Sequence, residues 1–347
     1  MVEAYLYRKI KGKTAQCQTC AHYCIIENGQ RGICGVRKNK NGKIYSLVYG
    51  KPCAIHIDPI EKKPFFHFLP GTRSLSLATA GCNFTCANCQ NWSISQGPKI
   101  SDEIDLPSFS KSIEGEKKIT PKNLVELALK NNVPSISYTY TEPTVFLEYA
   151  LDTMKLAKKK NLKNAWVTNG FLSKESFELI APYLDAANVD LKSFSNDFYA
   201  KYCGGQLFPV LETLKLMKKN KIWTEITTLV IPGLNDSEKN FKDTALFIKN
   251  ELGPETPWHI SRFSGTASWK FQDLPDTPLP TLALAHRIGI ETGLKYVYCG
   301  NVSGIESENT FCPHCQEKMI SRIGYSVKRA DNKGRCSKCN EKLNIIE

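Results

Sequence analysis

The sequence lacks the features of membrane-embedded and secreted proteins. Its 347 residues contain no run of about 18 apolar residues, the length a helix needs to cross a bilayer. The first thirty residues also lack the apolar core of a signal peptide. We therefore expect a cytoplasmic protein that makes no membrane contact.

The sequence also lacks the polar bias of a disordered chain. Hydrophobic residues make up 41%, enough to build a sizeable core. A chain of this length is typically divided into two or three domains.

Cysteine, in contrast, is abundant, with fourteen copies. Because disulfides are rare in a reducing cytoplasm, these cysteines indicate metal sites or redox chemistry. They form three groups and leave three single residues. The groups are Cys17, Cys20, Cys24 and Cys34; Cys82, Cys86 and Cys89; and Cys312, Cys315, Cys336 and Cys339; the single residues are Cys53, Cys203 and Cys299.

Positive charge is concentrated near the start of the chain. Residues 1–71 hold 12 basic and 4 acidic side chains, which is +8 of the total of +12. Such a region can attract nucleic acid or an acidic partner. We favour a solvated basic face over nucleic-acid binding, because the sequence has no RNA-binding motif.

The middle of the chain alternates between strand and helix patterns. Repeated βα units predict a parallel sheet. Six such units with a closing strand predict an α/β fold of the partial (β/α)6 barrel type. In such barrels the chemistry lies at the carboxyl ends of the strands. We expect three domains: residues 1–71, 72–304 and 305–347. The polar residues 97–118 are expected to form an insertion or lid without a clear element. The expected strands are 73–80, 135–140, 165–168, 187–191, 222–231, 258–263 and 295–299, and the expected helices are 121–130, 144–160, 173–184, 208–219, 237–252 and 282–292.

The middle cysteine group, CxxxCxxC, directly follows the first of these strands. Cys82, Cys86 and Cys89 can hold three irons of a 4Fe-4S cluster and leave the fourth iron open. A zinc site completed by Cys53 or His56 is the alternative, because structural zinc requires four ligands.

In this position, CxxxCxxC resembles the radical S-adenosylmethionine (SAM) superfamily. The resemblance implies that SAM binds the open iron and that the reduced cluster cleaves it to methionine and a 5′-deoxyadenosyl radical. That radical takes hydrogen from a substrate. The resemblance also implies a reductant such as ferredoxin or flavodoxin.

The resemblance extends to residues at later strand ends. Glu142, in Tyr-Thr-Glu-Pro, would accept a hydrogen bond from the SAM ammonium group, although the glycine pair of the family's GGE motif is missing. Asn169 would lie near the ribose or carboxylate of SAM. Asp190 and Lys192 match the DxK motif of glycyl-radical activating enzymes, and Lys192 would pair with the SAM carboxylate.

Two further strands would complete the SAM and substrate pocket. Thr227 begins the segment against which adenine packs in the family. His259 would line the substrate pocket; the alternative is that its ring is hydrogen-bonded within the sheet. Asn88 stands where the family has an aromatic residue before the last cluster cysteine, so adenine packing there must differ.

A narrower resemblance is to the radical SAM member of the AmmeMemoRadiSam system, whose members are often labelled as pyruvate formate-lyase activating enzyme homologues. It implies Memo-like and AMMECR-like proteins as partners but no substrate. The matching segments are 32–37, 57–64, 67–71, 89–92 and 296–301.

The C-terminal group consists of two CxxC motifs separated by twenty residues, which is a zinc-ribbon spacing. A tail of about 40 residues is too short to build its own core, so a metal would stabilise its fold. We expect a structural zinc at Cys312, Cys315, Cys336 and Cys339. Rubredoxin-like iron is the alternative, and nucleic-acid contact is less favoured.

The N-terminal group, CxxCxxxC followed by Cys34, is less regular. We favour a structural zinc at Cys17, Cys20, Cys24 and Cys34, with an auxiliary iron–sulfur cluster and an empty site as alternatives.

Three functions remain open at this point. The first is a radical SAM enzyme of unknown substrate, and the second is such an enzyme that modifies RNA or activates a protein partner. The third is a non-catalytic, metal-stabilised protein that binds nucleic acid or a partner. The strand-end residues favour an enzyme, because a binding module does not need them in register around an open cluster.

Overall fold

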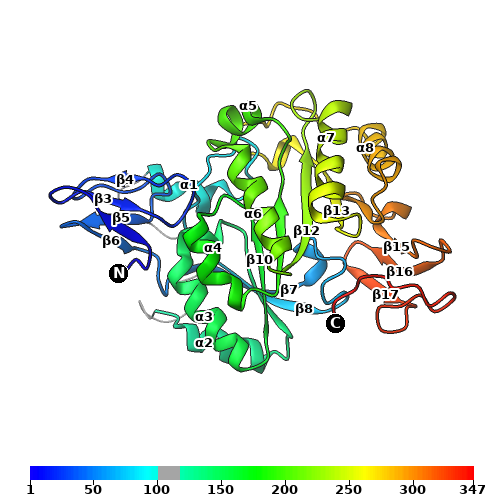
Figure 1. Cartoon of the computed structure of the whole chain (residues 1–347), viewed down its shortest axis with the longest axis horizontal. Coiled ribbons are helices and arrows are strands. Elements are labelled where there is room, and N and C mark those ends of the chain that lie inside the picture. Colours follow the sequence, from blue (N-terminus) through cyan, green and yellow to red (C-terminus); the bar gives the residue numbers. More distant parts are fainter. Residues whose placement is uncertain (101–117) are drawn as a thin grey trace.

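The computed structural model describes residues 1–100 and 118–347, and its central element is an eight-stranded sheet (Figure 1). The strands follow the order β14-β13-β12-β11-β10-β9-β8-β7. Strands β8 to β14 are parallel, which confirms the α/β class and all seven expected strands. Their bounds are β7 (Pro52–Pro59), β8 (Arg73–Thr79), β9 (Ser135–Tyr138), β10 (Lys163–Thr168), β11 (Ala186–Asp190), β12 (Trp223–Val230), β13 (Trp258–Arg262) and β14 (Val297–Gly300).

Strand β7 was not expected from the sequence. It pairs antiparallel with β8 and extends the sheet into the segment assigned to the N-terminal domain. Strands β7 and β14 form the two edges of the sheet, and no pairing between them closes a barrel in the described part of the chain.

The helices lie in the connections between the parallel strands, as the βα pattern predicts. Thr120 caps the start of α2 by accepting a hydrogen bond from the Asn123 backbone N–H, and Pro121 occupies the first helical position. The bounds are α1 (Trp92–Ile100), α2 (Pro121–Lys130), α3 (Leu147–Lys159), α4 (Lys174–Ile180), α5 (Asn196–Phe198), α6 (Leu207–Lys219), α7 (Glu238–Phe247) and α8 (Leu279–Thr292).

Helix α1 corrects one expectation. Residues 97–100 belong to this helix rather than to an insertion without structure, because the helix tolerates Pro98 in its last turn. The remainder of the expected insertion, residues 101–117, lies outside the described residues. No helix in the described ranges has the length and apolar character needed to cross a bilayer.

The N-terminal segment, residues 1–51, forms two small antiparallel sheets at the left of Figure 1. A buried ion pair joins it to the helices around the central sheet, since the Arg37 guanidinium donates to both carboxylate oxygens of Glu148 on α3 at 2.9 and 2.8 Å. The strands are β1 (Val2–Glu3), β2 (Tyr7–Lys9), β3 (Ala15–Cys17), β4 (Ile25–Ile26), β5 (Arg37–Lys40) and β6 (Lys43–Ser46).

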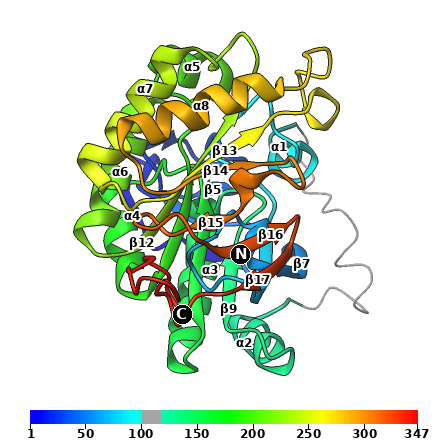
Figure 2. The same cartoon turned by 90° about the vertical axis from the view of Figure 1, so that its right-hand side faces the viewer.

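The C-terminal module, residues 305–347, lies at the other end of the molecule (Figures 1 and 2). It holds a three-stranded antiparallel sheet of β15 (Thr310–Phe311), β16 (Lys318–Ile323) and β17 (Ser326–Arg329). The module docks on residues 60–72, which connect β7 to β8. Ile346 bridges Phe68, and the buried Arg322 guanidinium donates to the Phe66 carbonyl at 2.8 Å.

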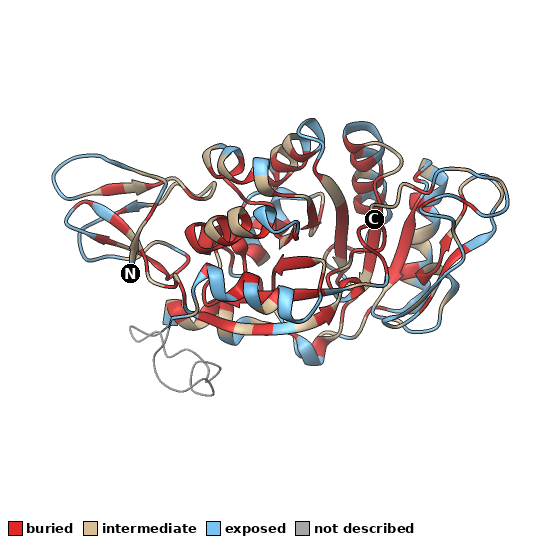
Figure 3. Cartoon of the chain, turned by 90° about the horizontal axis from the view of Figure 1, so that it is seen from below, coloured by how far each residue is buried: buried red, intermediate tan, exposed pale blue. Residues whose placement is uncertain are grey.

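Buried residues run through the whole sheet and its helices (Figure 3). Residues 60–72 fill the end of the sheet where the parallel strands begin, because Phe65, Phe68 and Leu69 pack there against Ala165 and Ala186. The opposite end, where the strands stop, is left for the polar residues described next.

Candidate functional site

The cysteine loop, residues 81–91, follows β8 and carries Cys82, Cys86 and Cys89. Cys86 is buried and the other two are half-buried. Gly81 has a φ of 99°, and a Cβ there would come within 2.7 Å of Val36. The loop therefore depends on glycine to pack against the N-terminal segment.

A π-helical turn, Tyr199–Cys203, holds the cysteine loop from the other side. The backbone N–H groups of Thr85 and Ala87 donate to the carbonyls of Cys203 and Tyr202 at 2.8 and 2.9 Å. The Cys203 thiol also hydrogen-bonds Cys86. The sequence leaves the role of Cys203 open. The adjacent Gly204-Gly205 pair, which allows this close packing, was the sequence feature that could have placed Cys203 beside the cysteine loop.

The environment of Cys86 favours its thiolate. The hydrogen bond from Cys203 and the nearby positive charge of Lys192 lower the pKa of Cys86, although burial opposes them. Because thiolate is the form that binds metals, this arrangement suits a metal ligand.

Glu142 is fully buried at the end of β9, and its carboxylate is held by four hydrogen bonds. Oε1 accepts from the backbone N–H and hydroxyl of Thr144 and from the hydroxyl of Thr168, at 2.6 to 3.1 Å. Oε2 accepts from the Asn169 backbone N–H at 2.8 Å. Burial raises the pKa of Glu142. Because Oε2 accepts this single hydrogen bond from the described residues, it retains a lone pair for another donor.

Asn169 connects this carboxylate to the cysteine loop. Its side-chain amide donates to Asn83 Oδ1 at 2.7 Å, and Asn83 is the residue directly after Cys82. The Asn83 amide in turn donates to the Phe171 carbonyl at 3.3 Å. Asn83 was not expected from the sequence as a site residue.

Asp190 and Lys192 form an ion pair at the end of β11, with Lys192 Nζ 2.9 Å from Asp190 Oδ2. Burial alone would lower the pKa of Lys192, but Asp190 and the sulfurs of Cys86 and Cys203 raise it. Lys192 is therefore a fixed positive charge beside the cysteine loop.

Lys99 on α1 is a second cation that sequence reasoning missed. Its Nζ donates to the Phe84 carbonyl at 2.7 Å, inside the cysteine loop. Burial lowers its pKa, while Cys82, Cys34, Cys86 and Cys89 act in the opposite direction. Lys99 thus lies between the middle and N-terminal cysteine groups, and no motif in the sequence marks it.

The loop also holds an unsatisfied acceptor. Asn88 Oδ1 is buried and has no hydrogen-bond partner among the described residues. A buried polar atom without a partner is costly, so its presence fits a site that receives a polar ligand.

Two predicted residues lie apart from this group. The Thr227 hydroxyl donates to Asn188 Oδ1 at 2.8 Å. His259 Nε2 hydrogen-bonds Glu225 Oε2 at 2.7 Å, and its ring packs against Phe66 near the docked C-terminal module. The structure thus brings Glu142, Asn169, Asp190 and Lys192 to the cysteine loop but holds Thr227 and His259 in contacts of their own.

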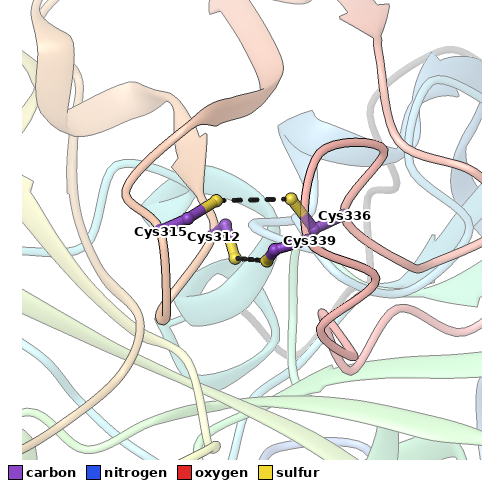
Figure 4. A group of neighbouring side chains, drawn as sticks. All are labelled: Cys312, Cys315, Cys336 and Cys339. Carbon is purple, nitrogen blue, oxygen red and sulfur yellow. Dashed lines mark hydrogen bonds between the residues drawn. The ribbon is translucent and has the colours of Figure 1, made fainter.

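The four N-terminal cysteines line one cavity, which also reaches Asn83 and Thr144 of the barrel. The four C-terminal cysteines instead form a compact group (Figure 4). Their sulfur atoms all lie within 4.8 Å of one another, with Cys312 and Cys339 at 3.5 Å and Cys315 and Cys336 at 3.5 Å.

The chain is similar to several known proteins. The family model of the radical SAM superfamily matches residues 76–245. An uncharacterized protein of Methanocaldococcus jannaschii is 45% identical over 349 residues, which covers all of both chains. The pyruvate formate-lyase-activating enzyme of Clostridium pasteurianum is 24% identical over 191 residues, covering 52% of this chain and 71% of that enzyme. Among solved structures, a radical SAM methyltransferase from Sphaerobacter thermophilus is 13% identical over 67% of each chain, with a TM-score of 0.49.

Proposed function

The chain belongs to the radical SAM superfamily, and on this premise we propose that it is an enzyme that cleaves SAM reductively at the cysteine loop. Cys82, Cys86 and Cys89 would hold a 4Fe-4S cluster. With SAM bound, this cofactor supplies one electron that breaks the carbon–sulfur bond, giving methionine and a 5′-deoxyadenosyl radical that abstracts hydrogen from the substrate.

The observation that carries the proposal is the meeting of Glu142, Asn169 and Lys192 at a loop of three thiols. The free lone pair of Glu142 Oε2 would accept from the SAM ammonium, a charge-assisted hydrogen bond. Lys192, oriented by Asp190, would pair with the SAM carboxylate.

Four further residues are proposed to contact or support the bound SAM, each on a separate observation. Asn88 Oδ1 would accept a hydrogen bond from the ligand where relatives have an aromatic residue. Asn169 would act near the ribose or carboxylate of SAM. Thr227 and His259 would act from the interior of the sheet, through Asn188 and Glu225.

We further propose one zinc at the C-terminal cysteines. Zinc–thiolate bonds of about 2.3 Å in a tetrahedron put the sulfurs about 3.8 Å apart, close to the spacing of this group. None of the fourteen cysteines, all of which lie in the described residues, forms a disulfide, which is consistent with a cytoplasmic location. Ferredoxin or flavodoxin would be the reductant, and Memo-like and AMMECR-like proteins are proposed partners.

A second candidate is the activation of a protein partner, the activity that the name of the Clostridium pasteurianum relative describes. One surface feature favours a large substrate. Trp92, which is 43% exposed, stacks on Trp269 beside the cysteine loop, with ring centroids 6.4 Å apart. Lys270 Nζ lies 4.2 Å from the Trp269 ring and its backbone N–H donates to the Ala87 carbonyl.

The test is the formation of 5′-deoxyadenosine by the anaerobically reconstituted protein with dithionite and SAM. Cys86→Ala should abolish the product, because it removes one of three cluster ligands. Cys299→Ala is the matched control, since this buried thiol lies outside all three groups and contacts the Leu282 carbonyl. If Cys86→Ala still forms 5′-deoxyadenosine, the proposal is wrong.

A further inference from the structure

The N-terminal and C-terminal cysteine groups have the same number of thiols but different geometry. The C-terminal sulfurs lie within 4.8 Å of one another, as a single tetrahedral ion requires. Within residues 1–100 and 118–347, which include every cysteine, no other group of three or more cysteine, histidine, aspartate or glutamate ligand atoms is that compact. The N-terminal sulfurs are therefore more widely spaced than those of the C-terminal group.

The N-terminal sulfurs surround a cavity instead. Cys17, Cys20, Cys24 and Cys34 all face it, and Ile26 and Val145 supply part of its apolar wall. In an iron–sulfur cluster the four thiolates are divided among two or four irons, so the ligand sulfurs stand around an inorganic core and span a wider space than around one ion. This wider, partly enclosed arrangement suits such a core.

Two positively charged side chains lie close to the cavity. The Arg37 guanidinium is fully buried at the cavity wall and interacts with Cys17 and Cys34. The half-buried Lys99 also interacts electrostatically with Cys34. Arg37 is already paired with Glu148, so Lys99 is the one of these two cations whose charge would offset the net negative charge of a thiolate-bound cluster.

The cavity also lies directly beside the SAM site. Asn83, which follows Cys82, is part of its lining, and His22 Nε2 hydrogen-bonds the Asn83 carbonyl at 2.9 Å. Lys99 interacts electrostatically with Cys34 and with all three cysteines of the cysteine loop. A redox group in this cavity would be next to the group that must be reduced.

We propose that Cys17, Cys20, Cys24 and Cys34 bind an auxiliary iron–sulfur cluster that relays electrons to the cysteine loop. A one-electron reductant such as ferredoxin reduces this cluster, which returns to its oxidised state by passing the same electron on, and no bond forms or breaks. The binding of the cluster is independent of the proposed function, whereas the relay rests on it.

The first test uses the triple variant Cys82→Ala, Cys86→Ala and Cys89→Ala, reconstituted anaerobically with iron and sulfide. It should retain about two to four irons and a similar amount of acid-labile sulfide per chain, with an electron paramagnetic resonance (EPR) signal that SAM does not change, because all ligand positions are filled. A triple variant with zinc and no iron, or with neither metal beyond the C-terminal site, would overturn the proposal. This readout does not depend on SAM cleavage, so it separates failure of the cluster from failure of the proposed function.

Paired variants in the native chain test the assignment of ligands. Cys20→Ser with Cys24→Ser should remove only the auxiliary iron, and the matched control Cys336→Ser with Cys339→Ser should remove zinc and leave the iron unchanged. If the first pair keeps all its iron, the ligands are wrongly assigned. Should it misfold, the triple variant still decides the case.

The relay is tested by EPR of the fully reduced native protein. Two adjacent reduced clusters should give spectra broadened by spin coupling, and the broadening should disappear in both the triple variant and the Cys20/Cys24 variant. A native spectrum equal to the sum of the two variant spectra would overturn the relay.

Discussion

The two four-cysteine regions differ in what holds them together. The C-terminal module packs a small core around its cysteines, with Met319, Ile320 and Leu343, and would depend on a bound ion for its fold. The N-terminal segment holds its cysteines around a cavity whose wall is partly made by the barrel. The four C-terminal thiols thus lie within one module, whereas the four N-terminal thiols line a site whose wall includes residues around the central sheet.

The buried arginines that dock the two regions differ in the same way. Arg37 has a carboxylate partner, and Glu148 raises its pKa although burial alone would lower it. Arg322 donates to the carbonyls of Phe66 and Glu308 and to the Thr310 hydroxyl, and burial lowers its pKa. The N-terminal segment therefore docks through an ion pair. The C-terminal module instead docks through neutral hydrogen-bond acceptors and through the Phe66 ring, which lies 4.1 Å from the Arg322 guanidinium carbon.

The largest expected effect is the loss of the C-terminal ion. Cys336→Ser removes a buried ligand, and because structural zinc contributes about 10 kcal/mol or more to folding of a small site, the module should unfold locally. Hydrogen exchange should show residues 310–345 losing protection while the barrel keeps it. SAM cleavage should persist, since the cysteine loop lies at the other end of the strands. Cys299→Ser serves as the control; unchanged protection in Cys336→Ser would remove the contrast between the regions.

The next largest effect tests the ionic docking of the N-terminal segment. Glu148→Gln keeps the shape of the side chain but leaves the Arg37 charge buried and unpaired, which should cost about 3–5 kcal/mol in the free energy of unfolding. The matched control is Glu3→Gln, because Glu3 pairs with Lys43 at 2.9 Å on the surface, where such a pair contributes about 0–1 kcal/mol. Urea unfolding measures both. Equal losses in the two variants would mean that the buried ion pair does not anchor the segment.

Sequence reasoning found the strands and the cysteine loop because these depend on local pattern. The β-rich segments bounded by turn residues predicted all seven parallel strands, and parallel strands bring their carboxyl ends to one edge of a sheet. For that reason the sequence alone was enough to expect Glu142, Asn169, Asp190 and Lys192 near the loop.

The rest depends on contacts between distant segments. Lys99 contacts the cysteine loop because residues 92–100 fold back over Phe84. Cys203 interacts with Cys86 although the two residues are far apart in the sequence, and no motif spacing predicts that contact. Cysteine spacing likewise could not distinguish a compact thiol group from thiols around a cavity, because sulfur separation is set by the tertiary packing of the segment. His259 could be assigned from the sequence either to the pocket or to a hydrogen bond within the sheet, and the structure shows its hydrogen bond to Glu225, a residue with no motif.

The smallest effect concerns His67, which lies where the C-terminal module docks. Its Nδ1 hydrogen-bonds the Leu343 carbonyl at 3.1 Å and its Nε2 the Tyr298 hydroxyl at 2.7 Å. Burial lowers its pKa from 6.5 to about 4; the Glu225 carboxylate opposes this shift, and the neighbouring Arg322 adds to it. The unfolded chain therefore binds a proton at a higher pH than the folded chain does.

The stability that neutral His67 contributes is complete above about pH 6.5 and is lost as the pH falls towards about 4. Between about pH 7 and about pH 5 this amounts to about 2 kcal/mol. His67→Gln cannot titrate, so its free energy of unfolding should fall less over that range than that of the native chain, whatever its absolute stability. Because the ion pair of Arg37 and Glu148 contains no histidine, acid should reduce the hydrogen-exchange protection of residues 310–345 before that of residues 1–51. Parallel pH profiles for the native chain and His67→Gln would show that the docking of the module does not depend on a neutral His67.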